Sequence, residues 1–300
     1  MAKGIVNRLV AASPFSLGVI RAVVHGTFLI SILFTSFSAL GHLPVTIFRP
    51  TGAMKLLPWS FYEYLIRPNA MELFKWLLVL VLVSGTVGFF TPVATKLSFL
   101  LVVLYQGVLR SFGHFNHDEM LAIYYLVVLA FTPCGDGFSV DSVLRRQKER
   151  PRLAYSYPVL LMWLLMSWTY FSSALIKLRI GGLKYLSPDN LPALAIFHSL
   201  DNLHDTQFKF AFWLPQVRSY LPVVVFIVLL WELLFPLVIL RRWRPWLLAF
   251  GVAFHISTLF LMNIFFPFQL AMYLVFVDWD SFRRRLGEKG WLPRGPGRVS

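Results

Sequence analysis

A lysine stands near the end of a long apolar run, in the stretch "TYFSSALIKL" of residues 169–178. This lysine, Lys177, has two interpretations. In one, its four-carbon stem lies along lipid and the ammonium group reaches the headgroups. In the other, the side chain lies in an apolar slot that favours the neutral amine, which can act as a base or a nucleophile. The run alone does not decide between them.

The densest polar cluster is "GHFNHDEM", residues 113–120, between two apolar runs. Asn116 can cap the following helix, and the two acidic residues after it suit the positive end of that helix. Such a structural role explains His114 and His117 less well. Two imidazoles are too few ligands for a metal site, and the chain has a single cysteine, so we expect no metal.

Two further ionisable residues interrupt apolar runs: Glu232 in "LLWELLF" and His255 in "AFHISTLF". At membrane depth such residues usually face the interior of the bundle and mark a pathway or a site. The alternative is a Glu–His or Glu–Lys pair that joins helices. Arg21, in the first apolar run, is expected to be an anchor at the cytoplasmic surface.

The elements that position these residues follow from the composition. Hydrophobic residues make up 57% of the 300-residue chain and charged residues only 14%, against about 25% charged in soluble domains. Several apolar runs reach the roughly 20 residues that cross a bilayer. We therefore predict an all-α, polytopic integral membrane helical bundle of about eight transmembrane helices. The expected spans are 17–40, 71–90, 94–112, 117–133, 155–178, 219–240, 244–264 and 265–279.

These spans predict a single transmembrane domain over residues 1–300, with a core of about 15–280 and a basic cytoplasmic tail at 281–300. The net charge is +14. The basic residues form short clusters beside apolar runs, at 143–154, 241–244 and 283–285, which is typical of cytoplasmic membrane flanks and not of nucleic-acid binding.

Eight spans place all three clusters on the side of the N-terminus. We therefore expect both termini in the cytoplasm and the lipid bilayer as the partner. A basic, apolar, cysteine-poor chain with short loops is compatible with a bacterial inner (cell) membrane, which we expect as the location. The sequence identifies no protein partner.

Three segments carry a resemblance to a known family. Asn116-His117 begins a helix, "YFSSALIKL" (170–178) ends in Lys-Leu, and Phe254-His255 precedes "FLMNIFFPF". In this order they resemble the membrane domain of vitamin K-dependent gamma-glutamyl carboxylase, within the wider horizontally transferred transmembrane domain family. The order and spacing cover roughly residues 15–280.

The resemblance implies a chemistry. Lys177 would deprotonate a reduced naphthoquinone of the vitamin K or menaquinol type, an isoprenoid quinol that partitions into lipid. Oxygen would convert that anion to a strong base, which removes a proton from a glutamate before carbon dioxide adds. An outward-facing pocket around Lys177 would hold the quinol. The candidate residues around it are Asn116, His117 and His255 for orienting the chemistry, with His114 and Glu232 for contacting the cofactor.

Two other functions remain open at this point. The chain could be a non-catalytic membrane protein that binds lipid or quinone, or a partner subunit. It could also be a small-molecule transporter that uses Glu232 and His255 as a proton relay, although the paired interrupted helices of many transporters are not evident.

Overall fold

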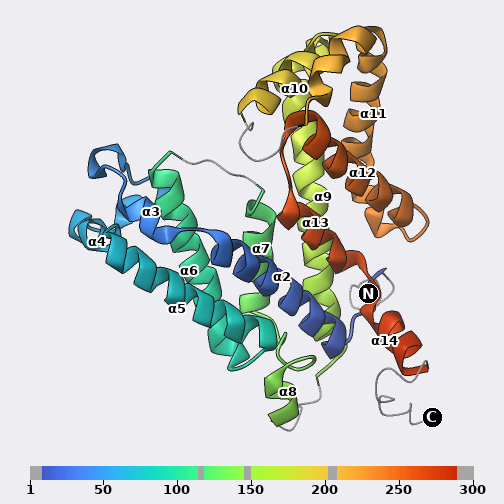
Figure 1. Cartoon of the computed structure of the whole chain (residues 1–300). Helices are drawn as coiled ribbons and strands as arrows, with labels where there is room; N and C mark the ends of the chain where they lie inside the picture. Colours follow the sequence, from blue (N-terminus) through green and yellow to red (C-terminus); the bar gives the residue numbers. More distant parts are fainter. Residues whose placement is uncertain (1–8, 114–117, 145–149, 202–207, 289–300) are drawn as a thin grey trace. The chain divides into compact units, whose positions relative to one another are not determined.

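The computed structural model describes residues 9–113, 118–144, 150–201 and 208–288, and their regular elements are all helical (Figure 1). Six segments within these ranges are long and apolar enough to cross a membrane, so the chain is an integral membrane protein with about six spans. Five are the helices α2 (Pro14–Phe34), α5 (Pro68–Val87), α6 (Thr91–Ser111), α9 (Leu153–Gly181) and α12 (Arg244–Met262). The sixth is α11 (Leu221–Leu234), flanked by the 3-10 helices η4 (Phe210–Tyr220) and η5 (Phe235–Ile239).

The prediction of an all-α membrane bundle is confirmed. The two remaining predicted spans correspond to shorter apolar segments, α7 (Met120–Ala130) and α13 (Pro267–Met272) with η6 (Tyr273–Phe276). The first span ends at Phe34 and not near residue 40, because Thr35 and Ser36 take extended backbone conformations. The other elements are α3 (Phe37–Gly41), η1 (Val45–Ile47), η2 (Gly52–Leu56), α4 (Trp59–Leu65), α8 (Val140–Leu144), η3 (Gly182–Leu186), α10 (Asn190–Asp201) and α14 (Trp279–Glu288).

The chain divides into two compact units. The first comprises residues 1–162 and 274–300, and the second comprises residues 163–273, so the division falls inside α9. The expectation of one continuous domain stays a prediction.

In the first unit, α2 packs along α5, α5 pairs with α6, and α6 pairs with α7 (Figure 1). The start of α7 lies beside the end of α6, where Arg110 Nη2 is 2.7 Å from Met120 Sδ. The turn after α7 packs on the first part of α2 so closely that a Cβ on Gly18 would lie 1.9 Å from the Gly137 carbonyl oxygen. Helix α7 therefore runs from the end of α6 back to the start of α2.

The residues at the start of α2 also form hydrogen bonds with the first residues of α9 and α14. The Ala12 N–H donates to Ser156 Oγ (3.2 Å), and Arg152 Nη2 donates to the Ala11 carbonyl (3.2 Å). The Ser13 hydroxyl donates to the Asp280 carboxylate. The first residues of α2, α9 and α14 consequently lie at one end of the first unit.

Arg21 is not the surface anchor that we expected. Its side chain is wholly buried, with 0% exposure. Its Nη1 donates to the Cys134 carbonyl (3.0 Å), and its Nη2 donates to the carbonyls of Phe138 (2.6 Å) and Thr86 (3.3 Å). Carbonyls at the end of α5 and in the turn after α7 have no partner within their own helices, and a buried carbonyl needs a donor. Arg21 supplies it for both segments at once.

In the second unit, α10 packs on η4 and α12, while α11 packs on η3 and η4. Helix α12 ends at Asn263, which adopts a left-handed conformation (φ 54°). The Asn263 amide donates to the carbonyl (3.2 Å) and hydroxyl (3.0 Å) oxygens of Ser199, and its oxygen accepts the N–H of Phe208 (3.2 Å). The chain turns here between α12 and α13, and Asn263 also fixes α10 against α12.

Candidate functional site

The site begins with one face of α9. Tyr170, Ser173 and Lys177 follow one another at intervals of three and four residues, which places them on the same side of a helix. Ala174 belongs to this side too; it is fully buried and packs against Val225 and Leu229 of α11. The small alanine lets α11 come close to α9 beside the polar residues.

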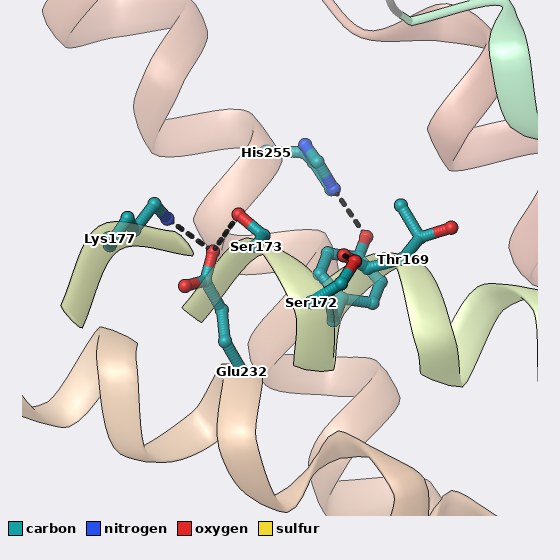
Figure 2. A network of polar contacts seen from close by, with 7 residues as sticks. Thr169, Ser172, Ser173, Lys177, Glu232 and His255 are labelled. Carbon is teal, nitrogen blue, oxygen red and sulfur yellow. Dashed lines mark hydrogen bonds and ion pairs between the residues drawn. The ribbon is translucent and has the colours of Figure 1, made fainter. Parts of the chain in front are cut away.

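Helix α11 brings Glu232 to this face. Val225, Leu229 and Glu232 recur at four and three residues, so the two apolar residues that pack on α9 lead directly to the glutamate. Lys177 Nζ lies 2.5 Å from Glu232 Oε1. The Ser173 hydroxyl donates to the same oxygen at 3.4 Å. Figure 2 shows both side chains of α9 turned toward the single carboxylate.

The pair is asymmetric in its exposure. The Lys177 side chain is 25% exposed, whereas that of Glu232 is 3% exposed. Within the described part of the chain, Glu232 Oε2 is buried and has no hydrogen-bond partner. A buried carboxylate is unfavourable unless it is paired, so Lys177 stabilises Glu232 while its own side chain stays partly exposed. Such a pair can move a proton between its two members.

A second polar cluster surrounds the Tyr170 hydroxyl. It lies 2.7 Å from His255 Nε2 and 2.5 Å from the Tyr273 hydroxyl, and it accepts a bond from Gln269 Nε2 at 2.9 Å. All four side chains are buried. A phenol has one donor and two acceptor positions. With Gln269 donating, Tyr170 donates to either His255 or Tyr273 and accepts from the other.

Aromatic packing fixes this cluster. The Tyr170 ring lies 4.7 Å from the Trp231 ring and 4.4 Å from the Phe235 ring, centroid to centroid. Gly251 leaves the space that the Tyr273 hydroxyl fills, because a Cβ there would be 2.2 Å from that oxygen. The hydroxyl, imidazole and amide groups therefore sit in an otherwise apolar setting, where their mutual hydrogen bonds are strong.

Three of the predicted site residues can be placed. Lys177 and Glu232 are brought together, so Glu232 forms the Glu–Lys pair and not the Glu–His pair. His255 lies in the Tyr170 cluster of the same unit. Residues His114, Asn116 and His117 lie outside the described ranges, so their meeting with Lys177 stays a prediction. In the described ranges, no group of three or more His, Cys, Asp or Glu side chains could hold a metal ion.

The sequence interpretation missed four residues of these clusters: Ser173, Tyr170, Gln269 and Tyr273. The first two carried a signal, because they precede Lys177 by four and seven residues and so share its helix face. Nothing in the sequence pattern singled out the last two, whose polar groups are recruited by tertiary packing.

No protein-family model, curated protein or solved structure matches this chain. The resemblance to the carboxylase membrane domain therefore rests on its three motifs.

Proposed function

We propose that the Lys177–Glu232 pair removes a proton from the hydroxyl of a lipid-soluble substrate, a reduced naphthoquinone with an isoprenoid tail. One observation carries this proposal: the amine of a partly exposed lysine lies 2.5 Å from a buried carboxylate that has a second, unpartnered oxygen within the described structure. Ionisable groups inside membrane helices are costly to keep and commonly functional.

The chemistry of the pair follows from its surroundings. When the shared proton lies on Glu232, both groups are neutral and Lys177 has a lone pair. The amine can then accept the proton of an acidic hydroxyl: the O–H bond breaks, an N–H bond forms, and the resulting oxyanion lies beside an ammonium group. Glu232 Oε2 is available to accept a second hydrogen bond. His255, as part of the Tyr170 cluster, would help to orient the substrate.

The resemblance extends this to a reaction class. A reduced naphthoquinone would supply the acidic hydroxyl and, with oxygen, the driving force for carboxylation of a glutamate. Lys177 would be the base toward the quinol, and Asn116 and His117 would orient the reacting groups. His114 completes the set of expected contacts. Membership of the horizontally transferred transmembrane domain family is part of this proposal.

We also propose eight membrane crossings. Hydrogen bonds join the start of α2 to the starts of α9 and α14. If these starts share one side of the membrane, an even number of crossings must separate them. Between α2 and α9 this requires α7 in addition to α2, α5 and α6. Between α9 and α14 it requires the α13–η6 segment in addition to α9, α11 and α12. The basic clusters would then face the cytoplasm of a bacterial cell, with both termini.

A second function is favoured by a different feature: the polar groups of both clusters already have hydrogen-bond partners within the protein. The Lys177 amine already has a partner and the Tyr170 hydroxyl already has three. Both clusters could then serve only to hold the helices together. The chain would be a non-catalytic lipid- or quinone-binding protein or a partner subunit, and a bound quinone would not be converted.

The test is turnover in lipid nanodiscs. Reduced menaquinone, oxygen, bicarbonate and a glutamate-containing peptide are added, and mass spectrometry measures quinone epoxide and carboxylated peptide. Lys177→Ala is compared with Lys184→Ala, an exposed lysine seven residues further on. We expect epoxide from the wild type and from Lys184→Ala, and none from Lys177→Ala. Quinone that binds without forming epoxide in the wild type would contradict the base role and favour the binding function.

A further inference from the structure

Helix α14 is an amphipathic segment that follows the last apolar segment of the chain. Trp279, Phe282 and Leu286 recur at three and four residues and share one face, while Arg284 and Arg285 lie away from it. A short helix of this kind is typical of the interface between a membrane and water.

Tertiary contacts fix α14 at the beginning of α2. Asp280 accepts a hydrogen bond from Ser13, which also caps α2. The guanidinium of Arg283 lies 4.7 Å above the Phe15 ring. Since α2 is a membrane span that starts at Pro14, these contacts place α14 at the level where lipid tails give way to headgroups. Arg283 is engaged in holding the helix.

The remaining groups point outward. Arg284 and Arg285 are exposed, and Phe282 is 50% exposed. Arg284 Nη2 donates to Ser281 Oγ at 2.7 Å. Of the acidic residues in this region, Asp280 accepts a hydrogen bond from Ser13 and Asp278 accepts one from Ser281. Two exposed guanidinium groups thus lie at adjacent positions of α14.

We propose that Arg284 and Arg285 bind the headgroup of an anionic phospholipid. Guanidinium groups pair with phosphate oxygens through two parallel hydrogen bonds. Phe282 belongs to the apolar face of the same helix and can enter the boundary of the acyl chains. The charge is complementary, and the position at the start of a span puts lipid phosphates within reach. This site lies in the first unit and does not depend on the function proposed for Lys177.

The experiment is native mass spectrometry of protein released from nanodiscs that contain phosphatidylglycerol and phosphatidylcholine. The variant Arg284→Gln/Arg285→Gln is compared with Arg241→Gln/Arg242→Gln, which removes the same charge from another exposed pair. Each arginine near an anionic surface contributes about fivefold to binding, so the first variant should bind phosphatidylglycerol about 30-fold more weakly. The second variant should lose less phosphatidylglycerol binding than the first, and phosphatidylcholine binding should be unaffected in all three proteins.

Equal loss in both variants would show that net charge alone attracts the lipid and would overturn the site. Unchanged binding in the Arg284→Gln/Arg285→Gln variant would overturn it as well. The variant Arg284→Lys/Arg285→Lys controls for a folding defect. It keeps both positive charges but lacks the planar guanidinium groups that can form two parallel hydrogen bonds. We expect this variant to bind more weakly than the wild type and more tightly than the glutamine variant; binding as weak as that of the glutamine variant would contradict the proposal.

Discussion

Removing either member of the Lys177–Glu232 pair should destabilise the protein by unequal amounts. Lys177→Met leaves a carboxylate that is 3% exposed, with the Ser173 hydroxyl as its remaining hydrogen-bond partner among the described residues. Breaking a buried pair in this way costs about 3–5 kcal/mol. Glu232→Gln leaves a lysine that is 25% exposed, and Lys177 can still donate to the amide oxygen of the glutamine. The free energy of unfolding should therefore fall by only about 1–2 kcal/mol. The two variants should differ by about 2 kcal/mol.

The double variant Lys177→Met/Glu232→Leu completes the cycle. Replacing a buried pair by apolar residues of similar size is often close to neutral, so we expect its free energy of unfolding within about 1 kcal/mol of the wild type. Reversible unfolding in mixed micelles with increasing dodecyl sulfate, followed by tryptophan fluorescence, measures all four proteins. The reasoning from exposure would be refuted if the two single variants lost equal free energy of unfolding. It would also be refuted if the loss in the double variant equalled the sum of the two single losses.

Two more perturbations test the structure. Gly251→Ala places a methyl group 2.2 Å from the Tyr273 hydroxyl, so it should lower the free energy of unfolding by about 1–3 kcal/mol, read from the dodecyl sulfate midpoint; an unchanged midpoint would contradict the packing. Arg21→Lys cannot reach three carbonyls at once, so the yield of monodisperse protein should fall sharply on size-exclusion chromatography, and a normal yield would count against the buried contacts of Arg21.

The membrane helices could be predicted because their signal is local. An apolar run of sufficient length identifies a span wherever it occurs, and local breaks such as the left-handed Gly88 (φ 76°) end the helices. The boundaries were less accurate. The run from Leu17 to Leu40 contains no Asp, Glu, Lys or Arg after Arg21, so only the backbone at Thr35 and Ser36 reveals that α2 ends and α3 begins.

The contacts of the polar residues could be predicted only in part. Lys177 and Glu232 were identifiable as charges in apolar surroundings, yet 55 residues separate them, and no sequence period links them. Arg21 was misjudged for the same reason. A charge near the end of an apolar run usually marks the membrane surface, but its three carbonyl partners come from segments 65 to 117 residues away.

The central claim is that Lys177 takes a proton from a bound quinol, and the most direct measurement is the absorbance of that quinol without oxygen. Reduced menaquinone is added to the protein in nanodiscs under anaerobic conditions, and difference spectra report whether the bound quinol is neutral or anionic. The wild type and Lys184→Ala should show the spectrum of the anion, and Lys177→Ala should show the neutral quinol. A quinol that binds to the wild type and stays neutral would contradict the assignment of Lys177 as the base.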